Sequence, residues 1–316
     1  MPNACSFQSS FQNAFKVSVV GCGNVGAAAA YAMLLDGSPS ELALFDRDAK
    51  KVEGLLLDFE HSLSFFDTAR IMGSSDIEVC RDSELVVIAA GARQKEGESR
   101  LDLLKRNRAI FAELIPQLAK VAPKAIFLVV SNPVDILVKD ALALSGFPRN
   151  RVFGTGTFLD TARFRFHLSE ALCLSPKSVD AFILGEHGES SFPVLSSANI
   201  AGKALLSFEG MGEAEALAAY EATREAAAKI IQDMGYTCYS IGVIVKEVMQ
   251  AIVQHSKQVL PLSTVLQGEY GLHDVALSVP CIVDSSGISG ILEVPLNEKE
   301  QKQLQNSAAV LKRAAQ

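Results

Sequence analysis

Short apolar runs alternate with longer segments of helical periodicity through the first half of the chain. We expect strands at 16–20, 41–45, 85–90 and 125–130, and helices at 24–36, 48–65, 101–121 and 133–145. Continuous apolar strands separated by helices predict a parallel sheet that is covered on both faces. The first half therefore predicts an α/β fold with a doubly wound, Rossmann-type sheet.

The pattern changes after about residue 150. We expect a turn region at 190–200 and short strands within 257–292, beside a strand at 178–184 and helices at 158–173, 212–234, 236–256 and 297–315. Asn297 followed by Glu298 and Glu300 in the first turn is typical of a helix start. These elements predict a mixed α+β second domain. The expected division is a polar segment 1–14, a first domain 15–152 and a second domain 153–316, and segment 1–14 is either disordered or an assembly arm.

Composition excludes several classes of protein. A chain of 316 residues is long enough for two domains, and its net charge of −7 argues against a nucleic-acid-binding surface. The six cysteines lack the spacing of a metal site, so we expect no metal and reduced thiols in a reducing, cytoplasmic compartment. Residues 17–35 carry no charge, but three glycines and Asn24 favour a buried strand, turn and helix over a membrane span. No secretory signal and no membrane partner are expected.

A glycine-rich turn joins the first predicted strand to the first predicted helix. Gly21 permits the tight turn, Gly23 lets the backbone approach a pyrophosphate, and Gly26 lets helix and strand pack closely. Asp46 closes the next strand, where a carboxylate binds a ribose diol and repels a 2′-phosphate. The pattern predicts an NAD site. Arg47 leaves NADP possible, and a glycine turn used only for packing is the alternative.

Two further segments follow predicted strands at the edge where this fold binds ligands. Residues 91–100 are rich in glycine and charge, which suits a lid over a substrate or, alternatively, an exposed solvated loop. Asn132 can donate to a substrate oxygen or to the nicotinamide ribose. It is also suited to cap a helix whose first residue is Pro133.

His187 is the strongest candidate for proton transfer. It lies between Gly185 and Gly188, after an apolar run, where an imidazole can exchange a proton near neutral pH. Asp160 and Arg163 are three residues apart and share one helix face, which is equally typical of an ordinary salt bridge. The sharper hypothesis is that Asp160 orients and charges His187 while Arg163 binds a substrate carboxylate.

Together these motifs identify the chain as resembling the lactate/malate dehydrogenase family. The resemblance extends from Lys16 to the C-terminal helix, through the segments V-V-G-C-G-N-V-G, A-G-A-R-Q-K-E-G-E-S-R-L, V-S-N-P-V-D, L-D-T-A-R-F-R, G-E-H-G-E-S and M-G-Y-T. It implies an NAD-dependent oxidoreductase of glycolysis that acts on a small 2-oxo or 2-hydroxy acid. A homo-oligomer, either a tetramer or a dimer, is also implied.

The resemblance implies a role for each matching residue. His187 would be the proton donor and acceptor with Asp160 as its partner, and Arg100 would polarise the reacting carbonyl. Arg163 would bind the substrate carboxylate, and Asn132 the substrate oxygen. The cofactor would contact Asp46 through its adenosine ribose, and its cleft would be lined by Val25, Gly91, Ala92, Val130 and Thr155.

Two positions bear on the choice of substrate within the family. Gln94 lies where the malate dehydrogenases of this group carry an arginine for a second carboxylate, and Thr237 also matches the lactate branch. We therefore expect interconversion of pyruvate and L-lactate. Malate dehydrogenase, a dehydrogenase of a bulkier 2-oxo acid, and an NAD-binding protein without catalysis remain the alternatives.

The site at which fructose 1,6-bisphosphate activates many bacterial members departs from the family pattern. Its arginine matches Arg165, but its histidine is replaced by Asp180. A carboxylate repels a bisphosphate. Strong activation by this sugar phosphate is therefore not expected.

Overall fold

The structure, a computed structural model, describes residues 15–65, 70–92 and 100–315. Segment 1–14, Gln94 and most of the predicted lid 91–100 lie outside the described residues. Arg100 begins a helix, but its side chain also lies outside them.

One nine-stranded sheet runs through the described part of the chain, in the order β12-β11-β10-β6-β5-β4-β1-β2-β3. Its strands are β1 (Lys16–Val20), β2 (Glu41–Phe45), β3 (Arg70–Ser74), β4 (Leu85–Ile88), β5 (Ile126–Val129), β6 (Val152–Gly154), β10 (Gln258–Gln267), β11 (His273–Asp284) and β12 (Gly287–Ile291). The first six pair in parallel, and β10, β11 and β12 continue the sheet antiparallel. The order β3-β2-β1-β4-β5-β6 is the doubly wound arrangement expected from the sequence.

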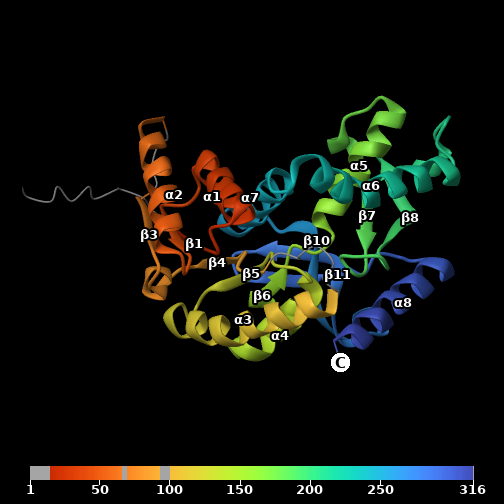
Figure 1. Ribbon diagram of the computed structural model, residues 1–316. Helices are drawn as coiled ribbons and strands as arrows, with labels where there is room; N and C mark the ends of the chain where they lie inside the picture. Colours follow the sequence, from red (N-terminus) through yellow and green to blue (C-terminus); the bar gives the residue numbers. More distant parts are fainter. Residues whose placement is uncertain (1–14, 66–69, 93–99, 316) are drawn as a thin grey trace, which may run out of the picture.

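Helices cover both faces of this sheet. Helices α1 (Asn24–Asp36) and α7 (Tyr239–Val253) lie side by side on one face, and α3 (Arg100–Val121) and α4 (Val134–Ser145) cover the other (Figure 1). Helix α2 (Ala49–Ser62) packs against the β3 edge. The central strands β4 and β5 are buried along their whole length, as their unbroken apolar sequences require.

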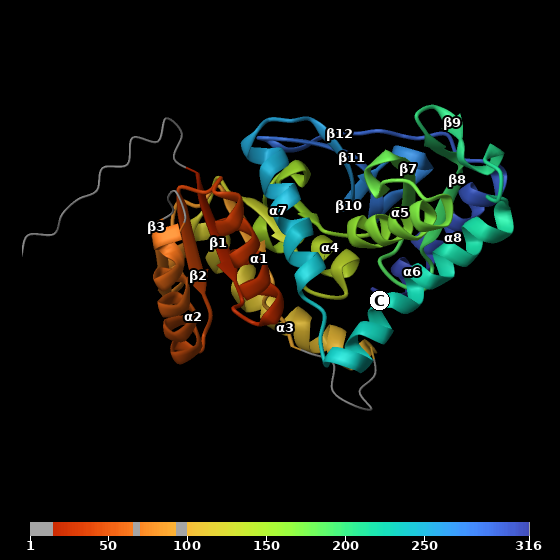
Figure 2. The ribbon, with the colours of Figure 1, turned by 90° about the horizontal axis from the view of Figure 1, so that it is seen from above.

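A second, smaller sheet lies at the end of the molecule away from α2 (Figure 2). Strands β7 (Val179–Leu184), β8 (Phe192–Ile200) and β9 (Lys203–Ala204) form an antiparallel sheet. Helices α5 (Phe158–Leu172) and α6 (Glu213–Met234) pack beside it (Figure 2). Helix α8 (Glu298–Ala314) begins at an Asn297 cap, as expected, with Glu300 completing a reciprocal capping box.

The structure corrects three of the expected elements. The region 190–200 was expected to be a turn region, but Phe192–Ile200 form strand β8, whose conformation is set by antiparallel pairing with β7. The strands in 257–292 are not all short: β10 has 10 residues and β11 has 12, since each is buried on both faces. Strands β3 and β6 were not predicted, and both are brief stretches whose partners come from distant sequence.

The helix after Ser131 also begins one residue later than expected. Its N-cap is Pro133 and its first residue is Val134, so Asn132 is not the cap. The Asn132 Oδ1 still accepts a hydrogen bond from the Val134 amide at 3.3 Å.

Two negative findings apply to the described residues. No helix there is both long and apolar enough to cross a membrane. The five cysteines within the described ranges are all free thiols.

Candidate active site

The glycine turn lies at the point where the sheet order reverses, between β1 and β4. Gly21 has a φ of +97°, and a Cβ there would come within 2.6 Å of the Ala90 nitrogen at the end of β4. Its amide donates to the Phe45 carbonyl at 2.8 Å. The turn is therefore wedged against two neighbouring strand ends, where open α/β sheets bind ligands.

Gly23 and Gly26 face different surroundings. A Cβ on Gly26 would lie 1.9 Å from the Gly21 oxygen, so packing of α1 against the turn demands glycine there. A Cβ on Gly23 would meet no atom within 4 Å, so nothing in the described chain requires glycine at that position. The open space at Gly23 lies at the N-terminus of α1, a position that suits the close approach of a dinucleotide pyrophosphate.

Asp46 is held beside this turn. Its Oδ2 accepts a hydrogen bond from the Cys22 amide at 2.8 Å, and its Oδ1 accepts one from the Asp48 amide at 3.0 Å. The carboxylate is thus fixed at the carboxyl end of β2, facing the glycine turn, where it can receive a ribose diol. Arg47, next to it, is exposed.

Apart from Val25, which lies in the first turn of α1, the other predicted cofactor contacts follow the ends of β4, β5 and β6. Val130 and Thr155 are buried, with 8% and 4% exposure, and the Thr155 amide donates to the Val129 carbonyl at 3.0 Å. Gly91 is exposed, whereas Val25 and Ala92 are partly buried. These residues therefore line one edge of the sheet with the glycine turn.

Asn107 links two of these strand ends, and sequence reasoning missed it. Its Oδ1 accepts from the Ala92 amide and its Nδ2 donates to the Asn132 carbonyl, both at 2.7 Å. It is 1% exposed and lies on the buried stripe of α3 with Leu104 and Phe111. A polar residue in an apolar helical stripe was the signal that could have revealed it.

The predicted proton-transfer residues meet in the second half of the molecule. The His187 Nδ1 lies 2.7 Å from Asp160 Oδ2, and the Arg163 Nη1 lies 3.4 Å from Asp160 Oδ1. Asp160 and Arg163 lie in the first two turns of α5, whereas His187 follows the end of β7. Their side chains are 17%, 13% and 29% exposed, so the cluster is largely buried and reachable mainly at the histidine.

The charges of this cluster support one another. Burial alone would lower the pKa of His187, but the charge and hydrogen bond of Asp160 outweigh it and raise the pKa to about 9. Burial disfavours ionised Asp160, yet His187 and Arg163 hold the pKa of its carboxyl below its usual range. At neutral pH the cluster therefore holds an imidazolium, a carboxylate and a guanidinium, a set that can donate a proton and bind an anion.

The remaining predicted residues lie outside the His187–Asp160–Arg163 cluster. Thr237 is partly buried in the segment that joins α6 to α7, and Asn132 is exposed after β5. Burial lowers the pKa of Arg165, and the charge of Asp180 opposes this. The Arg165 Nε donates to the Ala181 carbonyl at 2.9 Å. No group of three or more metal-ligating side chains occurs in ranges 15–65, 70–92 and 100–315.

Comparisons with known proteins match nearly the whole chain. The family model of the lactate/malate dehydrogenase NAD binding domain matches residues 15–154, and that of the lactate/malate dehydrogenase alpha/beta C-terminal domain matches residues 157–316. The chain is 45% identical over 303 residues to the L-lactate dehydrogenase A chain of Eleginops maclovinus, which covers 94% of this chain and 91% of the relative. The L-lactate dehydrogenase A chains of Paranotothenia magellanica and Champsocephalus gunnari match with the same identity and coverage.

Proposed function

The chain belongs to the lactate/malate dehydrogenase family, and on that premise we propose that it interconverts pyruvate and L-lactate with NAD. The observation that carries the proposal is the buried His187–Asp160 pair with Arg163 beside it. A 2-oxo acid needs one group to protonate its keto oxygen and another to bind its carboxylate, and this cluster offers both.

The cofactor belongs at the glycine turn. Gly21, Gly23 and Gly26 would receive the pyrophosphate, Asp46 the adenosine ribose, and the remaining contacts would come from Val25, Gly91, Ala92, Val130, Asn132 and Thr155. When bound as NADH, the cofactor supplies the hydride that reduces the keto carbon. The first domain, 15–152, would then bind NAD and the second, 153–316, the substrate.

The chain's own residues perform the remaining steps. Arg163, kept charged beside Asp160, binds the substrate carboxylate and fixes its orientation. Protonated His187 donates to the keto oxygen, while Asp160 stabilises the imidazolium until the proton leaves. Asn132 holds the same oxygen, and Arg100 polarises the carbonyl at the start of α3. In lactate oxidation, neutral His187 accepts the proton instead.

Gln94 and Thr237 support pyruvate as the substrate. A neutral amide at 94 suits a methyl group and offers no charge to pair with a second carboxylate, and Glu96 and Glu98 follow closely in the sequence. Such a charge costs several kcal/mol to bury. The malate reading, a bulkier 2-oxo acid and a non-catalytic NAD-binding protein remain as outcomes of the test.

The test is NADH oxidation by the purified protein with pyruvate, oxaloacetate and a branched 2-oxo acid at equal concentrations. We expect kcat/KM for pyruvate to exceed that for oxaloacetate by ~100-fold or more. Gln94→Arg should reverse this preference, because it places a cation where the second carboxylate of oxaloacetate lies. Preference for oxaloacetate by the unmodified protein would support the malate reading, and turnover of none of the three would support a non-catalytic protein.

Assembly, compartment and control are further parts of the proposal. A homo-oligomer is supported by exposed apolar side chains on α1, α6 and α7, namely Tyr31, Leu35, Ile231, Met234, Tyr239 and Val243. Light scattering would distinguish a tetramer or dimer from a monomer.

We place the protein in the cytoplasm because buried, unpaired thiols suit a reducing compartment. Because Asp180 replaces the histidine of the activator site, fructose 1,6-bisphosphate should leave the KM for pyruvate unchanged.

A further inference from the structure

The main-chain amides of residues 185 to 187, which end at the candidate proton donor His187, each donate a hydrogen bond to a different element of the fold. The Gly185 amide donates to the Ser278 carbonyl of β11 at 3.0 Å. The Glu186 amide donates to Ser307 Oγ of α8 at 2.6 Å. The His187 amide donates to Asp135 Oδ2 of α4 at 2.7 Å. The position of His187 therefore depends on contacts from outside its own loop.

Of the three acceptors, only Asp135 is a carboxylate. It is 3% exposed, and its Oδ1 accepts a hydrogen bond from Ser263 Oγ of β10 at 2.6 Å. Burial raises its pKa to about 6, even though both hydrogen bonds favour the ionised form. A neutral acceptor would satisfy an amide at much lower desolvation cost, as Ser278 and Ser307 do for the two preceding residues. The charge at this position therefore calls for a separate explanation.

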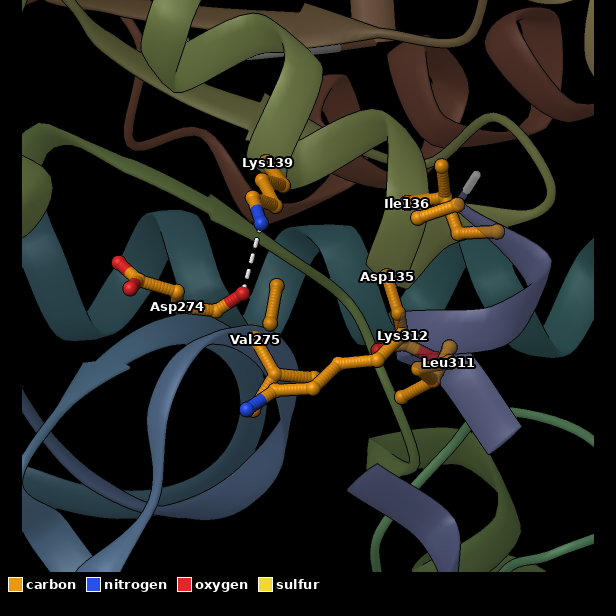
Figure 3. Close-up of a pocket in the computed structure, with 9 residues that line it drawn as sticks. Asp135, Ile136, Lys139, Asp274, Val275, Leu311 and Lys312 are labelled. Carbon is orange, nitrogen blue, oxygen red and sulfur yellow. Dashed lines mark hydrogen bonds between the residues drawn. The ribbon is translucent and has the colours of Figure 1, made fainter. Parts of the chain in front are cut away.

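Among the described residues, no cation forms an ion pair with Asp135. It lies at a pocket of about 310 Å³ between α4 and α8, which Lys139 and Lys312 also line (Figure 3). The Lys139 Nζ donates to the Asp274 main-chain oxygen at 2.7 Å, and among the described residues neither lysine forms an ion pair with Asp135. The positive charge that Asp135 favours is that of His187, whose pKa the Asp135 charge raises.

We propose that Asp135 is a positioning residue for the reaction, which fixes the main chain of His187 and electrostatically stabilises its protonated ring. This inference rests on the proposed function. Within ranges 15–65, 70–92 and 100–315, the charged groups that act on His187 are Asp160 and Arg163 from α5 and Asp135 from α4, and Glu186 lies beside it in its own loop. Two carboxylates thus act on one histidine, Asp160 through the ring and Asp135 through the backbone.

The two parts of this role are separable by substitution. In Asp135→Asn the amide oxygen can accept from the His187 amide and the NH₂ group can donate to Ser263 Oγ, so the contacts remain and the charge is lost. Asp135→Ala removes both the contacts and the charge. Ser263→Ala is a second variant, which frees one carboxylate oxygen. Asp274→Asn is the matched control, because it removes a carboxylate at the same pocket from an exposed side chain.

The first experiment is an NMR titration of the His187 ring in the cofactor-free protein, with His187→Asn to assign its signal. In Asp135→Asn we expect the midpoint of the titration to move to lower pH, with Asp274→Asn unchanged from the unmodified protein. Ser263→Ala should leave the midpoint close to that of the unmodified protein, because Asp135, whose pKa is raised only to about 6, stays ionised at the pH where His187 titrates. An unshifted midpoint in Asp135→Asn would overturn the electrostatic part of the role.

The second experiment measures pyruvate reduction at pH 8. Asp135→Asn should lower kcat by ~3- to 10-fold with KM within ~2-fold, and its pH profile should move to lower pH. Asp135→Ala should lower kcat by ~100-fold, because a small misplacement of a catalytic group has that effect. A normal kcat in Asp135→Ala would overturn the positioning part. If the unmodified protein does not reduce pyruvate, the proposed function fails, and the titration still decides whether Asp135 acts on His187.

Discussion

The two sides of the candidate site are built in opposite ways. The cofactor side consists of main chain at strand ends and glycines, with Asp46 as its one predicted charged contact. The proton-transfer side consists of charged side chains that compensate one another in a largely buried cluster. One side therefore depends on shape and the other on charge, so substitutions should affect them differently.

The largest expected effect is on the charged side. His187→Asn should lower kcat for pyruvate reduction by ~1,000-fold or more, because the reaction loses its proton donor. The dissociation constant of NADH, measured by fluorescence titration, should stay within ~2-fold, because the glycine turn is untouched. A kcat similar to that of the unmodified protein would remove His187 from the mechanism.

The next largest effects are on the cofactor side, where we expect one glycine to matter for stability and another for NADH binding. Gly26→Ala places a Cβ 1.9 Å from the Gly21 oxygen, so we expect a loss of ~1–3 kcal/mol in the free energy of unfolding. Gly23→Ala meets no atom of the described chain within 4 Å, so its Tm should change little. Because the added methyl faces the predicted pyrophosphate, it should weaken NADH binding by ~10-fold or more. Equal Tm losses in the two variants would contradict this assignment of packing and binding.

A third prediction concerns pH. Because the pKa of His187 is raised to about 9, pyruvate reduction should fall and lactate oxidation should rise as the pH passes through that value. The same shift links to folding: the stability that protonated His187 contributes is complete below its ordinary pKa and is lost as the pH rises toward 9. Urea unfolding at a series of pH values should show this decline, and His187→Asn should be less sensitive to pH over the same interval.

The smallest expected effect is on the choice between cofactors. Asp46→Ser removes a carboxylate that repels a 2′-phosphate, so the preference in kcat/KM for NADH over NADPH should fall by ~10-fold. The exposed Arg47 should then be able to contact that phosphate. Asp48→Asn is a useful control, because it changes a neighbouring acidic residue that caps α2. An unchanged preference in Asp46→Ser would show that Asp46 does not discriminate between the cofactors.

The same contrast explains how much the sequence could predict. The glycine turn and Asp46 were accessible because strand, turn and helix are contiguous, and their periodicities alone determine the order of elements. The pairing of His187 with Asp160 joins residues 27 apart and was inferred from residue types and from the family resemblance. Nothing local indicates that Asp135 meets Ser263, 128 residues away, or that Ser307 reaches the loop of His187.

The wrong prediction for residues 190–200 has a physical cause. Residues 190–200 are rich in serine and alanine, which are weak indicators of any element, and their conformation is set by pairing with β7. Long-range packing also determines Asn107, whose side chain joins two strand ends across an otherwise apolar helix face. Sequence patterns give the elements, whereas the polar contacts between them require the fold.

The shared sheet has a consequence for chimaeras between relatives. Strand β6 pairs with β5 on one side and with β10 on the other, through Gly154 opposite Ser263. A crossover near residue 152 therefore cuts through a continuous hydrogen-bonded layer, not through a linker. A fragment that ended there would leave an apolar strand edge bare, which favours aggregation. Successful exchange between relatives should require β6, β10 and β11 to be inherited together, so that the sheet sets the unit of recombination.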